Sequence, residues 1–394
     1  MGDLNRRQLL KAGAALSATA ALGPWFIKNA RAADVVRVGI LHSLSGTIAI
    51  AEAAIVDAEK MAIDEINAAG GVLGRKIEAI TEDGASDWPT FAEKAKKLLE
   101  RDKVAAVFGC YTSASRKAVL PVFEKNNGLL YYPTYYEGQE QSKNVIYTAQ
   151  EATQSVIAAC EWLAKNKGKN FFLVGSDYIY PRTCNKIAKP TIARMGGKVL
   201  GEEYIPLGNT EFASIINKIR AAKPDVIYST VVGGSNVAFY KQLVAAGLSG
   251  DKITLLSTVV SENEISGIGA ENAVGFYACM GYFQSLKNPA NEKFVKSIKA
   301  KYGQDRVVGD PMECGYTGVY FWKLAAEKAK SFDVDKVVTA SSEMPLDAPE
   351  GKIKLDKVNH HTWKYARIGR ALKDGQFEIV YESPIIEPNP FPKL

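Results

Sequence analysis

Strand-like and helix-like segments alternate along most of this chain of 394 residues. Short runs of β-branched and aromatic residues are each followed by a longer stretch in which apolar residues recur every three or four positions. The strand-like runs are 35–41, 76–81, 104–108, 129–133, 171–175, 225–232 and 253–259, and the helical stretches include 50–69, 91–101, 114–126, 154–167 and 211–222. Repeated strand–helix units predict an α/β fold in which parallel sheets carry helices on both faces.

The alternation falls into two series, which predicts two doubly wound parallel-sheet lobes. The first series ends near residues 145–151, and the second runs from 171 to about 283. Helical segments at 291–302, 313–330 and 334–342 follow, and then strand-like segments at 352–356, 362–368 and 377–381. We expect lobe 1 to contain 34–148 and 284–344 and lobe 2 to contain 149–283 and 345–394. The chain would then cross between the lobes at three hinges and enclose a cleft.

The chain begins with the pattern of an export signal, over residues 1–32. Two adjacent arginines, Arg6 and Arg7, precede an uncharged and mildly apolar stretch at 12–27, and an Ala-Arg-Ala sequence ends the segment. The arginine pair is typical of the twin-arginine route for folded proteins, although the ordinary secretory route also fits. The apolar stretch is too short to favour a membrane-spanning helix. We therefore expect a periplasmic protein that is soluble once the signal is removed.

Charge and motif content exclude several classes of function. The leader holds five basic residues and one acidic residue, so its removal lowers the net charge from +6 to +2. A nearly neutral chain does not favour nucleic acid or an anionic membrane as a partner. No phosphate loop, dinucleotide-binding glycine motif, hydrolase serine motif or zinc-protease motif occurs, and we expect neither a cofactor nor a metal. His360 and His361 are neighbours on a strand, so their side chains should point to opposite faces.

The five cysteines are an odd number and include no Cys-x-x-Cys pair. In an oxidising compartment some could form disulfides, but at least one must stay free or pair between chains. Cys110 and Cys279 lie in apolar runs, where a buried thiol usually acts as a small hydrophobic side chain.

Hydroxyl-bearing and aromatic residues gather where two successive strand-like runs end, at 109–115 and 130–138. The carboxyl ends of parallel strands form the ligand-binding edge of an α/β sheet, because helix N-termini with unpaired N–H groups converge there. The serine, threonine and tyrosine side chains in these segments donate and accept hydrogen bonds and carry no charge. None of them is a nucleophile beside a base. The pattern predicts a binding site for a small, neutral, planar molecule, and not an enzyme.

Eight short segments, spread in order over nearly all of the mature chain, form a family pattern. They are Gly39-Ile-Leu-His-Ser-Leu-Ser-Gly46, Gly109-Cys-Tyr-Thr-Ser-Ala-Ser-Arg-Lys117, Tyr132-Pro-Thr-Tyr-Tyr-Glu-Gly138, Gly175-Ser-Asp-Tyr-Ile-Tyr-Pro-Arg182, Tyr204-Ile-Pro-Leu207, Asp310-Pro-Met-Glu313, Asp347-Ala-Pro-Glu-Gly351 and Asn359-His-His361. In them the chain resembles a type I periplasmic solute-binding protein of an ABC importer, in the branched-chain amino acid superfamily. It is similar to the urea and short-chain amide binders of that group. The resemblance implies a two-lobed receptor whose partners are the permease and ATPase of an importer.

The resemblance also implies which side chains surround the ligand. They are Tyr111, Ser113, Tyr132 and Thr134 in the first lobe and Tyr178 and Tyr180 in the second. The Ser113 hydroxyl, at the start of a helix, would meet the ligand carbonyl, and the Thr134 and tyrosine oxygens would accept from its N–H groups. Tyr131 alternates away from Tyr132 along the strand, so we expect it to pack in the core.

Four further residues are candidates by position. Thr230, Thr258 and Tyr282 end strands of the second lobe. Glu313 lies just before a helical stretch, where its carboxylate could accept a ligand N–H or favour the helix N-terminus.

Several ligands remain open. Tyr111, Thr134 and the segment 148–152 depart from the residues usual in urea binders, which leaves the choice between urea and a short amide open. An amino acid ligand would need a carboxylate for its ammonium group, which Glu262 or Glu264 could supply. A secreted amide hydrolase is a further alternative, but it would need a nucleophile and base that the cleft motifs lack.

Overall fold

The computed structural model describes residues 35–393, and the predicted export signal lies outside this range. The strands are β1 (Val35–His42), β2 (Lys76–Asp83), β3 (Val107–Gly109), β4 (Leu130–Tyr132), β5 (Val145–Tyr147), β6 (Asn170–Ser176), β7 (Lys198–Ile205), β8 (Val226–Thr230), β9 (Thr254–Ser257), β10 (Tyr277–Met280), β11 (Pro345–Ala348), β12 (Gly351–Leu355), β13 (Thr362–Trp363), β14 (Arg367–Ala371) and β15 (Phe377–Glu382). The α-helices are α2 (Ala49–Ala68), α3 (Trp88–Lys96), α4 (Ser113–Asn126), α5 (Ala158–Asn166), α6 (Ile179–Arg194), α7 (Ala213–Ala222), α8 (Gly234–Ala245), α9 (Glu262–Ile268), α10 (Ala270–Ala273), α11 (Pro289–Tyr302), α12 (Asp310–Ala329) and α13 (Val334–Ser341). Two π-helical turns, Lys97–Arg101 and Thr153–Ile157, adjoin α3 and α5.

Two sheets form the centres of two lobes. The first has the order β2-β1-β3-β4-β5, and its pairs β1–β3, β3–β4 and β4–β5 are parallel. The second has the order β15-β14-β10-β9-β8-β6-β7, and the five strands from β10 to β7 pair in parallel. The predicted α/β fold with two parallel-sheet lobes is confirmed. The prediction missed the strands β5, β7, β10 and β11, the helix α8 and most of the helix α6.

The chain leaves the first sheet after β5, leaves the second after β10, and joins the second again at β14. We expected the chain to return to the second lobe at residue 345, but it joins the second sheet only at β14, which begins at Arg367. Strands β11, β12 and β13 form a small antiparallel sheet of their own. Ala348, Ile353 and Leu355 from this sheet pack in the hydrophobic cluster of the first lobe. The apolar face of the hairpin therefore holds residues 345–355 against lobe 1, and β14 and β15 join the second sheet in antiparallel fashion.

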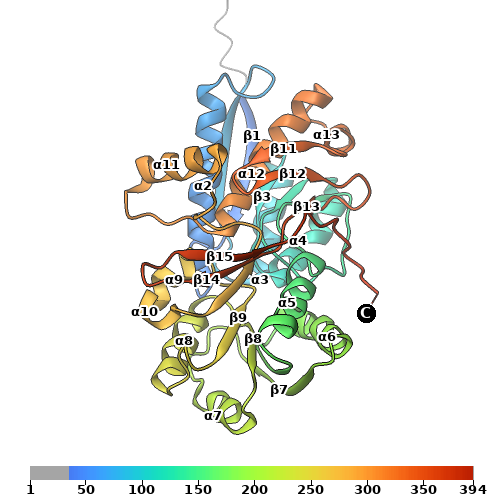
Figure 1. Cartoon of the computed structure of the whole chain (residues 1–394). Helices are drawn as coiled ribbons and strands as arrows, with labels where there is room; N and C mark the ends of the chain where they lie inside the picture. Colours follow the sequence, from blue (N-terminus) through green and yellow to red (C-terminus); the bar gives the residue numbers. More distant parts are fainter. Residues whose placement is uncertain (1–34, 394) are drawn as a thin grey trace, which may run out of the picture. The chain divides into compact units, whose positions relative to one another are not determined.

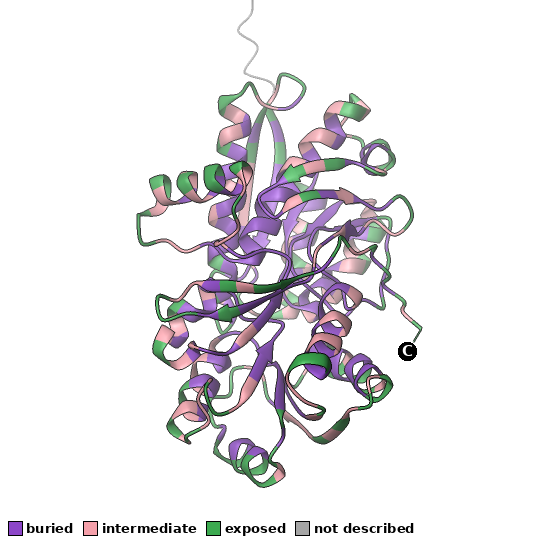
Figure 2. Cartoon of the chain, in the orientation of Figure 1, coloured by how far each residue is buried: buried purple, intermediate pink, exposed green. Residues whose placement is uncertain are grey.

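The late helices α11, α12 and α13 pack on the first lobe. Helix α12 packs lengthwise on α2, and Figure 1 shows the orange helices beside the blue N-terminal segment. The inner strands of both sheets are buried along most of their length, whereas the edge strands β2, β7 and β15 are more exposed (Figure 2). All five cysteines are buried and unpaired, so the disulfides that the sequence left open are not formed.

The loop between β3 and α4 has a tightly constrained backbone. A Cβ atom at Gly109 would lie 2.2 Å from the Leu41 carbonyl oxygen, so only glycine fits there. Cys110 follows in the left-handed region, with φ of 67°. The Thr112 side chain then caps α4 by accepting a hydrogen bond from the Ser115 N–H, at 3.0 Å. These features hold Tyr111 and Ser113 at the carboxyl edge of the first sheet.

Candidate ligand-binding site

Predicted site residues from both lobes meet around the Tyr135 side chain. Its hydroxyl lies 2.6 Å from the Tyr111 hydroxyl and donates to the Val259 carbonyl, at 3.2 Å, in the second lobe. Its ring lies 6.1 Å from the ring of Tyr111 and 6.1 Å from that of Tyr180, centroid to centroid. Tyr135 is 3 % exposed. The two lobes are therefore in direct, buried contact at this residue.

Further hydrogen bonds and ring contacts connect Tyr111 and Tyr180 to other predicted site residues in each lobe. The Tyr132 hydroxyl donates to the Tyr111 carbonyl at 2.6 Å, and the Thr134 hydroxyl donates to the Cys110 carbonyl at 3.4 Å. In the second lobe, the Tyr180 hydroxyl lies 3.2 Å from the Thr258 hydroxyl, and its ring lies 6.3 Å from that of Tyr178. Seven of the ten predicted residues thus form one group: Tyr111, Ser113, Tyr132, Thr134, Tyr178, Tyr180 and Thr258.

Ser113 begins α4, as predicted, but its hydroxyl is directed differently. It donates to the Glu137 carboxylate at 2.5 Å, so the proton predicted to meet a ligand carbonyl is used within the protein. The Arg116 guanidinium, one turn along α4, approaches the Ser113 oxygen at 3.3 Å and the Glu137 carboxylate at 3.6 Å. It also pairs with Glu140 at 2.7 Å. Ser113 can therefore offer lone pairs to a ligand but no free proton.

Burial keeps the site phenols neutral. It raises the pKa of Tyr111, Tyr135, Tyr178 and Tyr180 well above the ordinary value. For Tyr178 the phenols of Tyr132 and Tyr111 and the carboxylate of Glu137 raise the pKa further. Neutral phenols can both donate and accept hydrogen bonds.

Arg116 remains charged although it is fully buried. Burial opposes its charge, but Tyr132, Glu140 and Glu137 outweigh that effect and raise its pKa. Its guanidinium carbon lies 4.7 Å from the Tyr132 ring centroid and 4.3 Å from that of Tyr136, so the cation is stacked between two aromatic rings. The positive charge of Arg116 is thus balanced by Glu137 and Glu140 and stabilised by the two aromatic rings.

Three predicted residues lie elsewhere. The Thr230 hydroxyl donates to the Val174 carbonyl of the neighbouring strand, at 3.4 Å. Tyr282 follows β10 and packs in the first-lobe cluster, with its hydroxyl donating to Asn291 at 2.6 Å. Glu313, in the first turn of α12, accepts from Thr317 at 2.7 Å. None of these contacts joins them to the group around Tyr135.

Glu313 instead belongs to a buried set of charges that we call the crossover cluster: Asp310, Glu313, Glu350, Lys364 and Arg367. The Lys364 ammonium lies 2.8 Å from the Glu350 carboxylate and 4.0 Å from that of Glu313, and it donates to the Thr148 carbonyl at 3.0 Å. Arg367 donates to the carbonyls of Gly281 and Glu350. Asp310 accepts from the N–H groups of Gly281 and Tyr282 at 3.0 and 2.9 Å. The cluster therefore touches the chain near all three places where it passes between the lobes.

Sequence reasoning did not select Tyr135, Glu137 and Arg116 as site residues. All three lie inside segments that carried the resemblance, directly beside the selected positions. Alternation along a strand could not place Tyr135 and Glu137, because they follow β4 in a stretch without regular structure. Their roles depend on contacts with residues 21 to 124 positions away.

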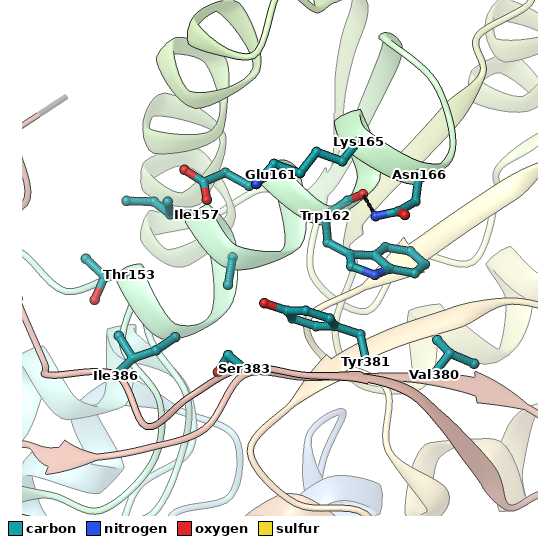
Figure 3. A pocket seen from close by; sticks show the side chains of 11 residues that line it. Thr153, Ile157, Glu161, Trp162, Lys165, Asn166, Val380, Tyr381, Ser383 and Ile386 are labelled. Carbon is teal, nitrogen blue, oxygen red and sulfur yellow. Dashed lines mark hydrogen bonds between the residues drawn. The ribbon is translucent and has the colours of Figure 1, made fainter.

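A separate pocket lies on the second lobe between α5 and β15 (Figure 3), with a volume of about 420 Å³. The Trp162 indole and the Tyr381 ring face one another across it, and none of the ten predicted site residues lines it. Among residues 35–393 no group of three His, Cys, Asp or Glu side chains is arranged to hold a metal. Within the same range no helix is long and apolar enough to cross a bilayer.

Comparisons with known proteins agree with this architecture. Residues 36–394 match the sequence model of a periplasmic binding protein domain, and residues 3–23 match that of a twin-arginine translocation signal. The Leu/Ile/Val-binding protein homolog 8 of Brucella abortus is 25% identical over 398 residues, which cover 94% of each chain. A limonene hydroxylase of Geobacillus stearothermophilus is 38% identical over 116 residues, but the match spans only 21% of that protein and 29% of this chain. Nothing of its activity is carried over.

Solved structures share the fold at low sequence identity. A solute-binding protein of an ABC transporter from Rhodopseudomonas palustris, in complex with 3,4-dihydroxybenzoic acid, superposes with a TM-score of 0.83 at 24% identity. The match covers 90% of this chain and 98% of that one. A leucine-binding protein from Thermotoga maritima gives a TM-score of 0.80 at 21% identity, covering 88% and 98% of the two chains.

Proposed function

The chain belongs to the periplasmic binding protein family, and from that premise we propose that it captures urea or a short-chain amide between its lobes and delivers it to an ABC importer. Whatever its ligand, the chain is an exported periplasmic solute-binding protein. Such a protein catalyses no reaction and works with the membrane subunits of the importer.

The observation that carries the choice of ligand is the junction around Tyr135, which is rich in uncharged hydroxyl groups. Phenol and alcohol oxygens of both lobes come together there, and the phenols remain protonated. Urea has four N–H donors and one carbonyl acceptor in a plane without net charge. Such a molecule needs several acceptors, one or two donors and aromatic walls, which these side chains supply.

The charges at this junction disfavour an acidic ligand. A carboxylate ligand needs a cation or several free N–H donors, because burying an unpaired charge is costly. Arg116, the cation in contact with the predicted site residues, is already paired with Glu137 and Glu140. This observation favours a neutral ligand over acids like the one bound to the Rhodopseudomonas protein.

An amino acid is the second candidate. The Leu/Ile/Val-binding homologs and the leucine-binding protein are similar over nearly their full length. The Glu264 carboxylate lies close enough to Tyr111 and Tyr135 to raise the pKa of both phenols beyond the effect of burial, so an acidic group is present for an ammonium. One of its oxygens already accepts from the Ser261 N–H and hydroxyl, at 2.8 and 2.6 Å.

The size of urea limits the affinity. Four heavy atoms at a ceiling of about 1.5 kcal/mol each give about 6 kcal/mol, or a Kd of tens of micromolar. A tighter complex requires that every ligand hydrogen bond is made and that lobe closure excludes water.

Isothermal titration of the mature protein tests the proposal. The panel is urea, acetamide, formamide, leucine and acetate, where acetate is the charged isostere of acetamide. We expect binding heat with urea or an amide and none with acetate. Heat with leucine alone would establish the amino acid alternative, and binding of acetate as tightly as acetamide would contradict a neutral site.

A further inference from the structure

Helix α8 begins with buried polar atoms that have no hydrogen-bond partner among the residues that the structure describes. The Asn236 side chain is 1% exposed and the Ser235 side chain is fully buried. Neither atom of the Asn236 carboxamide, nor the Ser235 hydroxyl, has a hydrogen-bond partner among residues 35–393. Burying a polar group without a partner costs about 1–3 kcal/mol. Such a cost in the first turn of a helix of 12 residues needs a compensating role.

The first turn of α8 lies at the junction of the two lobes. Helix α8 follows β8, so its N-terminus lies at the carboxyl edge of the second sheet, the edge where α/β proteins bind ligands. Gly233, which precedes the helix, approaches the first lobe. A Cβ atom there would lie 3.1 Å from the Thr47 carbonyl oxygen and 3.0 Å from the Ile48 side chain.

The buried face of α8 also packs near the residues around Tyr135. Asn236 and Tyr240 are four positions apart and both buried, so they share one face of the helix. Tyr240 belongs to the same buried hydrophobic cluster as Tyr111, Tyr135 and Tyr180. Asn236 is thus one helical turn from a residue that shares this cluster with the candidate site.

We propose that Asn236 binds the ligand from the second lobe through both atoms of its carboxamide. The Nδ2 group donates to the ligand carbonyl oxygen, and the Oδ1 atom accepts from the ligand N–H on the same edge. Two planar amides fit together in this way with two parallel N–H···O bonds. This inference rests on the proposed function and deepens it, because urea and primary amides present a carbonyl oxygen and an N–H group on the same edge.

The decisive experiment measures both the Tm and the ligand Kd of the variant Asn236→Leu. This substitution replaces the carboxamide with an apolar group of similar size. Because the wild-type carboxamide has no hydrogen-bond partner in the described part of the chain, we expect an unchanged or higher Tm. We also expect the Kd for urea or acetamide to rise at least tenfold. The matched control is Asn291→Leu. Asn291 is equally buried, but its carboxamide bonds to Tyr282, Gln284 and Leu286, so this variant should have a lower Tm.

The outcomes separate the two proposals. If Asn236→Leu lowers the Tm as much as Asn291→Leu does, Asn236 has a structural role, for instance through a bridging water, and the inference fails. It also fails if Asn236→Leu binds the amide as tightly as wild type. Wild-type protein that binds leucine or no ligand of the panel contradicts the proposed function itself, and the pairing with it.

Discussion

At the scale of single residues, Tyr135 links the two lobes directly. One hydroxyl group contacts a phenol of the first lobe and a backbone carbonyl of the second, and both contacts are buried. A hydrogen bond across the lobes exists only when they are closed. Its free energy therefore adds to the closed form and, through closure, to ligand affinity.

We predict that Tyr135→Phe weakens ligand binding while leaving the fold intact. The loss of a net hydrogen bond of about 1 kcal/mol should raise the Kd about fivefold. Titration calorimetry measures this change. Tyr131→Phe is the matched control, because Tyr131 packs beside Phe108 in the first-lobe cluster, at 5.4 Å between ring centroids. Equal effects of the two substitutions on the Kd would show that the Tyr135 hydroxyl has no special role.

At the level of the elements, the crossover cluster fixes how the connecting segments attach to α12. Lys364 lies between β13 and β14, where the chain passes to the second sheet, and contacts the carboxylates of Glu350 and Glu313. Burial raises the pKa of Glu313 to about 8, with the neighbouring Glu350 adding to the effect and Lys364 opposing it. The ammonium therefore compensates several buried acidic groups at once.

We predict that Lys364→Met strongly destabilises the protein. Removing one partner of a buried ion pair leaves the other uncompensated and costs about 3–5 kcal/mol, or a Tm decrease on the order of 5–10 °C by calorimetry. Lys143→Met is the control, since Lys143 forms an exposed pair with Asp335 and should change the Tm little. Adding Glu350→Gln to Lys364→Met should recover part of the loss. A Lys364→Met protein with wild-type Tm would contradict a compensating role for the ammonium.

On the scale of the whole molecule, several buried groups bind protons more tightly in the folded state. His42 lies between two carboxylates, 2.8 Å from Glu52 and 3.1 Å from Glu59. Burial alone would lower its pKa, but Glu59 and Glu52 outweigh this effect and raise it from 6.5 to about 10. Burial raises the pKa of Glu262 from 4.5 to about 8, with Asp310 and Glu264 adding to the effect.

The sign of the pH dependence follows from these shifts. A raised pKa means that protonation stabilises the folded form. The contribution of Glu262 is complete below pH 4.5 and is lost as the pH rises through 8, and that of His42 is lost between pH 6.5 and 10. Glu140 acts in the opposite direction. Burial would raise its pKa, but Arg116 and Lys117 lower it to about 2, so its contribution is lost as the pH falls from 4.5 toward 2.

We predict a higher Tm at pH 5 than at pH 9. Glu262→Gln should reduce the fall in Tm between pH 5 and pH 8, because the glutamine stays neutral at both values. Its side-chain oxygen can still accept the hydrogen bond that the Gln284 backbone N–H donates to Glu262. Glu378→Gln, at an exposed position of β15, should reproduce the wild-type profile. Calorimetry at matched ionic strength is the measurement, and a Tm that rises from pH 5 to pH 9 would contradict the prediction.

The sequence by itself determined the α/β class, the two sheets and the segments that carry Tyr111, Ser113, Tyr132, Thr134, Tyr178 and Tyr180. These features depend on local patterns, namely the alternation of strand and helix periodicity and the polar residues at strand ends. The physical reason is that a strand end and the following helix start are neighbours in sequence as well as in space.

Only the tertiary structure decided which polar groups meet. Lys364 contacts a carbonyl 216 residues away, and Tyr135 one 124 residues away, and no local pattern encodes such pairs. The same holds for the hairpin of β11 and β12, whose apolar side chains have the same alternation whichever lobe they pack on. The positions of Glu313 and Tyr282 away from Tyr135 have the same cause, because packing between distant segments selects the partner of a buried polar group.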